Sequence, residues 1–251
     1  MSHQPVANVD NHRVATVIPL YTHRLEAVEV RRLRVTLSNA PEGSTYFVGP
    51  PGLGMQLPAS LREQAQFVPF DAMHFASVRS YNRWVVQPGL YETFAKFEFL
   101  LLCQSDALLV RPLPADDAWE FDYLGAPWSP PIVAHWNPLR GRIVSGGPSV
   151  IARRLDVGNG GLSLRRTLAF ASLKNLPRFR KMPNEDVAIS YFGRRIGIRV
   201  APRAIAARFF METESTQWVA GMPFPGVYGF HALDRFNPAL EAALLAASEV
   251  G

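Results

Sequence analysis

The hydrophobic pattern of the chain is dominated by a nearly unbroken apolar run at residues 98–110. Such a run, followed at once by Arg111 and Pro112, predicts the central strand of a parallel sheet that is covered on both faces. The run contains one aspartate, Asp106, toward its end. An unpaired charge is costly in apolar surroundings, so Asp106 requires a cation, a metal or hydrogen-bond donors. Because ligands of open α/β sheets bind at the carboxyl ends of the strands, Asp106 is the first candidate binding residue.

Shorter segments on either side alternate between strand and helix patterns. The strand patterns occupy residues 13–19, 45–48, 66–70, 123–128, 198–201 and 206–210, and the helical patterns occupy 25–39, 77–97, 165–176, 184–192 and the alanine-rich end from residue 238. Pro88 and Gly89 interrupt the second helical pattern. This alternation predicts an α/β fold with a mostly parallel central sheet and helices on both faces.

Residues 129–156 show no period, because prolines, glycines and arginines are mixed there with Trp136. We expect a long irregular loop or insertion in this region. The first twelve residues are polar and predict a disordered tail. The sequence therefore predicts one domain over residues 13–251.

Composition places the chain among ordinary globular proteins, since it has 251 residues of which 48% are hydrophobic and 19% charged. No segment approaches the roughly 18 to 20 apolar residues that a membrane span needs, and the start of the chain is not signal-like. These features predict a cytoplasmic protein without a transmembrane segment. The single cysteine, Cys103, cannot form an internal disulfide, and we expect it to be a buried core residue.

Positive charge exceeds negative charge by five, and nearly all of the cations are arginines. The planar guanidinium suits phosphate groups, which weakly favours an anionic substrate. The arginines are dispersed along the chain, so nucleic acid is not the expected partner. Three adjacent pairs are candidates for peripheral contact with an anionic membrane: Arg31-Arg32, Arg153-Arg154 and Arg194-Arg195.

Candidate chemistry lies in three further segments, each with a structural alternative. Asn184-Glu185-Asp186 begins a helix, where it is either a cap with favourable first-turn acids or the source of a catalytic base. The glycine block of residues 158–161 makes a tight turn or lets a sugar approach the backbone closely. Tyr21 and Arg24 follow the first strand, where they either contact a nucleotide or lie free on the surface.

The order of four landmarks resembles GT-A glycosyltransferases, and in particular a family of glycosyltransferase-like domains of unknown function. The landmarks are residues 17–21 ending the first strand, 80–83 before the central strand, 104–106 ending it, and 184–186 opening a late helix. The block at residues 158–165 and the turn at 126–128 are the most specific pieces. The resemblance covers about residues 14–233.

The resemblance implies a site that handles a nucleotide diphosphate. GT-A enzymes carry an Asp-x-Asp motif that binds a divalent cation, Mn²⁺ or Mg²⁺; here Gln104 replaces the first acid, and His231 lies where many of these enzymes place a histidine ligand. The metal ligands are thus expected to be Asp106 and His231, and the base Asp186 ahead of Glu185. The implied nucleotide- and sugar-binding residues are Tyr21, Arg24, Asn82, Arg83, Asp106, Asn159, Gly160 and Gly161.

The predicted function is transfer of a sugar from a nucleotide diphosphate sugar to a hydroxyl acceptor, in polysaccharide or surface-glycan synthesis and with inversion by analogy. The loop at residues 129–156 is expected to select the acceptor. Two alternatives stay open. The missing acid at Gln104 favours a non-catalytic domain that binds carbohydrate or nucleotide sugar. A nucleotidyltransferase is less favoured, because residues 19–24 lack the glycines of a phosphate loop.

Overall fold

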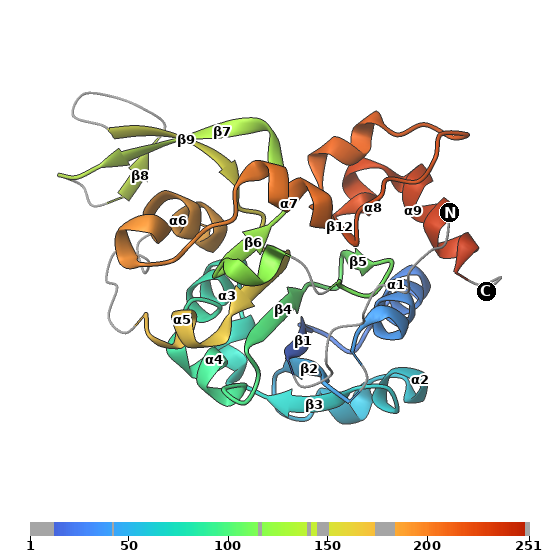
Figure 1. Ribbon diagram of the computed structural model, residues 1–251. Coiled ribbons are helices and arrows are strands. Elements are labelled where there is room, and N and C mark those ends of the chain that lie inside the picture. The colour runs from blue at the N-terminus through green and yellow to red at the C-terminus, as the bar shows by residue number, and fades with distance from the viewer. Residues whose placement is uncertain are drawn as a thin grey trace.

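The centre of the molecule is a six-stranded sheet with the strand order β3-β2-β1-β4-β10-β6 (Figure 1). The computed structural model describes residues 13–41, 43–114, 117–139, 142–144, 151–173 and 184–248. The strands of this sheet are β1 (Val14–Pro19), β2 (Thr45–Gly49), β3 (Gln66–Pro69), β4 (Phe99–Cys103), β6 (Tyr123–Gly125) and β10 (Leu162–Arg166). Strand β1 pairs in parallel with β2 and β4, and β2 with β3, whereas β10 is antiparallel to both β4 and β6. The mostly parallel sheet expected from the sequence is confirmed.

Helices cover both faces of the sheet, as the sequence predicts. The α-helices are α1 (Ala27–Asn39), α2 (Ala59–Arg62), α3 (Val78–Trp84), α4 (Pro88–Thr93), α5 (Thr167–Ala171), α6 (Glu185–Phe192), α7 (Arg203–Phe209), α8 (Leu233–Phe236) and α9 (Pro238–Ala247), and the 3-10 helices are η1 (Gly54–Gln56), η2 (Ala72–Phe75), η3 (Asp117–Glu120), η5 (Gly193–Ile196) and η6 (Thr213–Gln217). Within the described ranges, no helix combines the length and apolarity required to span a bilayer.

The alternation of side chains along β4 divides the core between the two faces. Leu100 and Leu102 pack in one apolar cluster with residues of α3, α4, α5 and α6. Leu101 and Cys103 point to the other face and pack in a second cluster with residues of α1 and α7. Cys103 is fully buried, which confirms its assignment as a core residue. Both faces of β4 are apolar because both are covered.

The apolar run at residues 98–110 is not one strand, which corrects the sequence-based prediction. Strand β4 ends at Cys103, and the chain turns at Gln104, Ser105 and Asp106 before it forms β5 (Ala107–Leu109). The Ala107 N–H closes the turn by donating to the Gln104 carbonyl at 2.9 Å. Strand β5 joins a second sheet in the order β11-β12-β5, with β11 (Phe210–Met211) and β12 (Gly229–His231). Asp106 therefore lies in a turn between two sheets.

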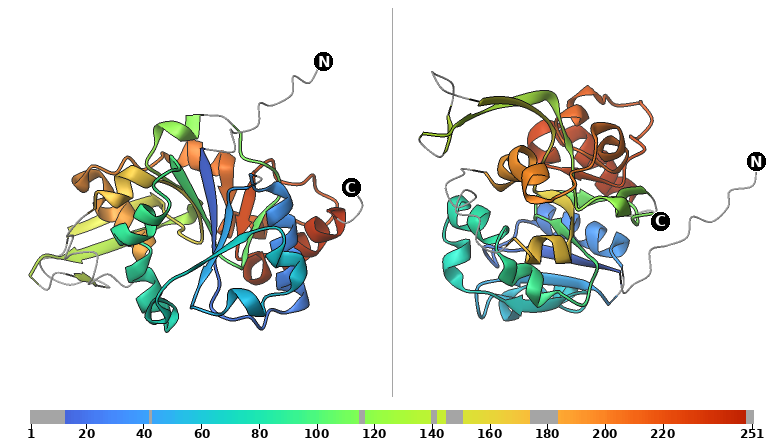
Figure 2. Two further views of the ribbon diagram at one scale, coloured as in Figure 1. Left: turned by 90° about the horizontal axis from the view of Figure 1, so that it is seen from below. Right: turned by 60° about the vertical axis from the view of Figure 1, so that its left-hand side comes forward.

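The described part of residues 129–156 is not an irregular loop, which corrects one of the two alternatives expected there; the other, an insertion, stays a prediction. Strands β7 (Pro127–Asn137), β8 (Arg142–Val144) and β9 (Ile151–Val157) form an antiparallel sheet that projects from the body, at the upper left of Figure 1 and again in Figure 2. The register between β7 and β9 shifts between Pro127 and Ile132. This irregularity interrupts the two-residue period by which a strand is recognised in a sequence.

The structure also corrects several secondary-structure predictions for the C-terminal part of the chain. The sequence predicts a strand at residues 206–210, but residues 203–209 form α7 and only Phe210 lies in a strand, β11. In place of the strand expected at residues 198–201, Val200 makes an isolated bridge to Tyr123. The helix expected after residue 164 begins at Thr167 and is described to Ala171. The alanine-rich helix α9 is confirmed. The predicted tail of residues 1–12 lies outside the described residues.

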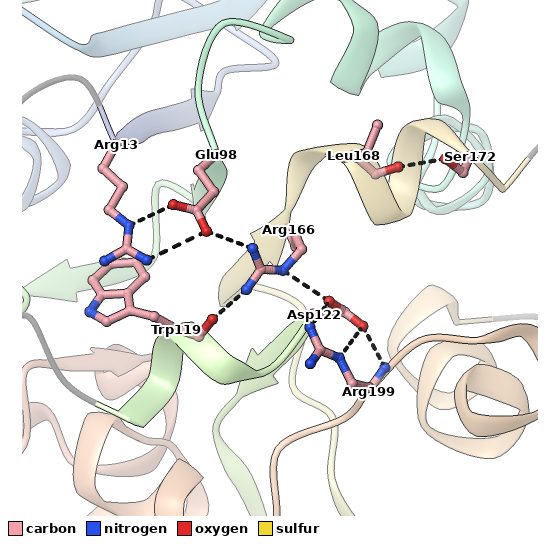
Figure 3. A network of polar contacts seen from close by, with 8 residues as sticks. All are labelled: Arg13, Glu98, Trp119, Asp122, Arg166, Leu168, Ser172 and Arg199. Atoms are coloured by element: carbon pink, nitrogen blue, oxygen red, sulfur yellow. Dashed lines mark hydrogen bonds and ion pairs between the residues drawn. The ribbon is translucent and has the colours of Figure 1, made fainter.

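One end of the central sheet is fastened by a network of charged side chains (Figure 3). Arg166 pairs with Glu98 at 2.6 Å and with Asp122 at 3.0 Å, and it also donates to the Trp119 carbonyl. Arg199 pairs with Asp122 at 3.0 Å. Since Arg166 is in register with Phe99 at the start of β4, this network lies at the opposite end of β4 from the Gln104–Asp106 turn.

A buried ion pair supports the turn itself. Arg32 of α1 lies 2.7 Å from Glu241 of α9, and both side chains are at least 93% buried (3% and 7% exposed). The same guanidinium donates to the Ser105 carbonyl at 2.9 Å. Arg32 thus joins the two helices to the turn that carries Asp106.

Replacing Arg32→Met should lower the free energy of unfolding by about 3–5 kcal/mol, because Glu241 is left buried without its cation. The control Arg34→Met, at an exposed position of the same helix, should change it by less than about 0.5 kcal/mol. Urea unfolding of both variants gives the comparison. Equal losses would show that the Arg32–Glu241 pair has no special structural role.

Candidate functional site

The turn after β4 lies beside His231 of β12. Strand β12 is antiparallel to β5 with His231 opposite Ala107, which places the imidazole beside the turn. His231 Nε2 lies 3.3 Å from Asp106 Oδ1 and 3.4 Å from Gln104 Oε1. The Asp106 side chain is still 33% exposed, so it pairs with His231 without being closed to a ligand.

The other side of the imidazole contacts a buried glutamate that sequence reasoning missed. His231 Nδ1 lies 2.9 Å from Glu212 Oε1, and Asn159 Nδ2 donates to the same oxygen. Glu212 follows β11 in a segment that also contains Glu214, and no local pattern distinguishes the two acids. The chain of contacts therefore runs from Asp106 through His231 and Glu212 to Asn159.

The two carboxylates determine the charge of His231. Burial alone would lower the pKa of His231, but the hydrogen bonds to Asp106 and Glu212 outweigh it and raise the pKa to about 9. Burial would likewise raise the pKa of Asp106, yet the hydrogen bond and charge of His231 bring it below its ordinary value. At neutral pH the pair is an imidazolium and a carboxylate.

The glycine block wraps closely around this cluster. A Cβ at Gly161 would lie 2.0 Å from His231 Nε2, and a Cβ at Gly160 would lie 2.0 Å from Glu185 Oε1. The Gly161 N–H donates to Asn159 Oδ1 at 2.9 Å, and the Gly161 carbonyl accepts from the Gln104 N–H at 2.8 Å. The glycines are thus required for space, since His231 and Glu185 occupy the positions that side chains would take.

The acid pair opens α6 beside the same glycines. Asn184 stands at the cap position, but its side chain makes no capping hydrogen bond. Glu185 is buried and lies 3.4 Å from Arg165 Nη2. Burial, and then the negative charges of Glu185 and Glu212, raise the pKa of Asp186 to about 8. Asp186 is therefore a far stronger base than an ordinary aspartate, which suits a proton acceptor near neutral pH.

Arg165 is a second residue that sequence reasoning missed as a site residue. Its side chain is completely buried on β10 and donates to the Gly160 carbonyl at 3.2 Å, Ser163 Oγ at 2.9 Å and Tyr91 Oη at 3.1 Å. The alternation of β10 contains a weak signal, because Ser163 and Arg165 share one face of the strand while two leucines share the other. Arg165 links the glycine block to Glu185.

Tyr21 brings an exposed ring to the site. It follows β1, is 43% exposed and packs edge-on against Tyr81, with 5.4 Å between the ring centroids. Burial and then the negative charges of Asp106 and Glu185 raise its pKa, so both carboxylates lie within electrostatic reach of the phenol. Arg24 and Arg83 are exposed and Asn82 is half-buried on neighbouring segments, and the nucleotide-binding roles of these three residues stay predictions.

The excess of acidic groups in the cluster is relevant to whether a divalent cation binds there. Four carboxyl groups, those of Asp106, Glu185, Asp186 and Glu212, face the cations of Arg165 and His231, and Asp186, with a pKa of about 8, carries little of the negative charge at neutral pH. A negatively charged diphosphate would be repelled unless further positive charge were present. The side chains expected to hold a divalent cation, Asp106 and His231, lie together beside the Gln104 amide oxygen, and His231 would have to lose its proton to bind one. No three His, Cys, Asp or Glu side chains of the described residues are arranged to hold a metal ion.

The fold and the site define a mixed α/β protein with a carboxylate and histidine cluster at the carboxyl end of a mostly parallel sheet. The chain belongs to the family described as "Protein of unknown function (DUF5672)", whose family model matches residues 64–231. The matched segment includes Asp106, the glycine block, Asp186 and Glu212, and it ends at His231. No curated protein sequence matches the chain.

Three similar solved structures share little sequence with this chain. One is a glycosyltransferase involved in the glycosylation of the major capsid of PBCV-1, with 12% identity, a TM-score of 0.42 and coverage of 95% of this chain and 100% of that chain. An active-site mutant of LgtC has 11% identity, a TM-score of 0.47 and coverage of 93% and 95%. CMP:2-keto-3-deoxy-manno-octonic acid synthetase, complexed with CTP, has 13% identity, a TM-score of 0.40 and coverage of 75% and 88%.

Substituting Gly161→Ala should destabilise the protein by about 1–3 kcal/mol, because the new methyl group displaces the paired His231. It should also bring the pKa of His231 back toward its ordinary value. Gly89→Ala is the control: it lies in a helix with nothing within 4 Å of the added Cβ, and should be neutral or stabilising by about 0.5–1 kcal/mol. Urea unfolding and a proton NMR titration of the histidines measure both effects. Identical behaviour of the two variants would contradict the packing argument.

Replacing Asp186→Asn should raise the melting temperature above that of the wild type by about 2–4 °C at pH 8–9. The pKa of Asp186 is raised in the folded state, so the native protein binds this proton more tightly than the unfolded chain. Wild-type stability therefore falls as the pH rises from about 4 through 8, and the advantage of the variant shrinks toward pH 5. Calorimetry from pH 5 to 9 measures the difference, with exposed Asp234→Asn as control. A difference that does not depend on pH would refute the assignment.

Proposed function

We propose that this protein transfers a sugar from a nucleotide diphosphate sugar to a hydroxyl group, in the synthesis of a polysaccharide or surface glycan. One observation carries the proposal. Tyr21, Asp106, His231 and the acid pair, which come from segments far apart in the sequence, converge around the glycine block. Convergence of an exposed ring, a charged pair and a strong carboxylate base supports group transfer more than a purely structural cluster.

The donor would lie across the turn at Gln104–Asp106. The ring of Tyr21 would pack against the nucleotide base, and the backbone of Asn159, Gly160 and Gly161 would line the sugar. Asp106 and His231 would hold a divalent cation, which when bound offsets the charge of the diphosphate and of the departing nucleotide.

The acceptor would be activated by Asp186. Its carboxylate takes the hydroxyl proton while the acceptor oxygen forms a bond to the anomeric carbon. The bond from that carbon to the phosphate oxygen breaks, and its electron pair leaves with the nucleoside diphosphate. A single displacement of this kind inverts the anomeric configuration. Arg165 holds Glu185 beside Asp186 throughout.

A binding domain without turnover is the second candidate function. Gln104 stands in place of an acid, and protonated His231 directs one N–H at Asp106 and the other at Glu212, which together leave few strong ligands for a metal. Such a domain would bind nucleotide sugars but release no nucleotide. A nucleotidyltransferase would instead release pyrophosphate from a nucleoside triphosphate and a sugar phosphate.

We expect nucleotide release when the protein is incubated with uridine, guanosine, thymidine or cytidine diphosphate sugars, a sugar acceptor, and Mn²⁺ or Mg²⁺. Asp186→Asn should lower kcat by about 10²–10⁴-fold with nucleotide binding preserved, since only proton transfer is removed. Asp106→Ala should weaken nucleotide binding in the presence of Mn²⁺. Coupled detection of free nucleotide and titration calorimetry separate the two effects.

Gly89→Ala serves as the control in these assays and should behave as the wild type. Full activity of Asp186→Asn would remove Asp186 from the mechanism. Binding without turnover under every metal and acceptor would favour the binding domain, and failure to bind any of the four nucleotides would overturn the proposed function.

A further inference from the structure

Two of the arginine pairs considered above for membrane contact, Arg153-Arg154 and Arg194-Arg195, contribute residues to one cavity whose lining does not include the acid pair. Arg153 and Arg154 lie on β9, and Arg194 lies in η5 directly after α6. Together with Arg203 of α7 they line a cavity of about 370 Å³. Arg32, from the Arg31-Arg32 pair, is instead buried against Glu241.

Two of these guanidiniums are held in place by other groups. Arg153 Nη1 donates to the Tyr191 carbonyl at 2.9 Å, and its guanidinium lies 5.0 Å from the centroid of the Tyr191 ring. Arg203 donates to the Trp128 carbonyl and pairs with Glu214 at 2.9 Å. Because these cations are already ordered, a ligand would lose little of its binding free energy in arranging them.

The other two lining arginines, Arg154 and Arg194, are exposed. Arg154 forms a surface pair with Asp156 at 3.1 Å, with 69% of the arginine side chain exposed. The residues that line the cavity include four arginines and a single acid, Asp156. Glu214 neutralises part of the charge of Arg203, and a clear excess of positive charge remains.

The shape of the site selects among anionic partners. A cavity of this volume falls within the range of small-molecule sites, at its lower end. A flat lipid surface does not enter such a hollow, whereas a phosphate group accepts paired hydrogen bonds from guanidinium forks. We propose that this cavity is a binding site for a small phosphate-bearing molecule of the sugar phosphate class.

The cavity is separate from the cluster around His231, yet the two are close along the chain. Val157 lines the cavity and directly precedes the glycine block. Ser190, one helical turn after Asp186, also lines it and donates to the Val157 carbonyl at 2.6 Å. The inference concerns binding alone and holds whether or not the protein transfers a sugar.

Titration calorimetry of the full chain at low ionic strength tests the site with inorganic phosphate, glucose 1-phosphate, glucuronate and glucose. We expect glucose 1-phosphate to bind, glucuronate to bind more weakly and glucose not to bind. The double variant Arg154→Gln/Arg194→Gln should weaken phosphate binding about tenfold or more, since two charge-assisted contacts are lost. Both positions are exposed, so the variant should fold as the wild type, which circular dichroism checks.

The matched control is Arg34→Gln/Arg79→Gln, which removes the same charge from exposed positions elsewhere and should change phosphate binding by less than about twofold. Equal weakening in both double variants would overturn the proposal in favour of a general electrostatic effect. Binding to anionic vesicles of phosphatidylglycerol, with no binding of the small molecules, would overturn it in favour of a membrane surface. Binding of nucleoside diphosphates is measured in parallel and should be equal in both double variants. A negative result for phosphate binding at this cavity can therefore be told apart from a negative result for the proposed transferase.

Discussion

The placement of His231 between Asp106 and Glu212 is the interaction on which the candidate site depends. A buried charge is tolerated only when it is paired, so the imidazolium of His231 requires the two carboxylates and the buried Glu212 requires His231. They belong to the turn after β4, the segment after β11, and β12, and the hydrogen bond from Asn159 to Glu212 adds the glycine block. This one contact chain therefore fixes the relative positions of two sheets and of the segment that faces Glu185.

The two ends of the central sheet contrast in their charge balance. At one end, Arg13, Arg166 and Arg199 meet Glu98 and Asp122, and the pKa values of both acids are lowered in spite of the burial that opposes it. At the other end carboxylates outnumber cations, and the pKa of Asp186 is raised. Ion pairs in which the charges balance stabilise the fold, whereas an excess of negative charge at one end favours the binding of a positively charged ligand there.

The parts of this molecule that sequence could predict are those with a local signal. The strand and helix alternation, the buried Cys103, and the prominence of Asp106 and of the glycine block all follow from neighbouring residues. Glu212 and Arg165 could not be found in this way, because their importance comes from contacts with residues 19 and 20 positions away, at His231 and Glu185. The break between β4 and β5 was missed for a similar reason: only the pairing of β5 with β12 shows that the apolar run serves two sheets.

Arg165 explains how two adjacent acids can have different electrostatic environments. Glu185 and Asp186 are neighbours in sequence, and the negative charge of Glu185 helps to raise the pKa of Asp186. The guanidinium of Arg165 contacts Glu185, while Asp186 faces the negative charges of Glu185 and Glu212. The environment thus separates the pair into a carboxylate that is held by a cation and one whose pKa is raised toward neutrality. Separation of this kind is how a protein obtains a base from an aspartate, and here it depends on a residue that is completely buried beneath the glycine block.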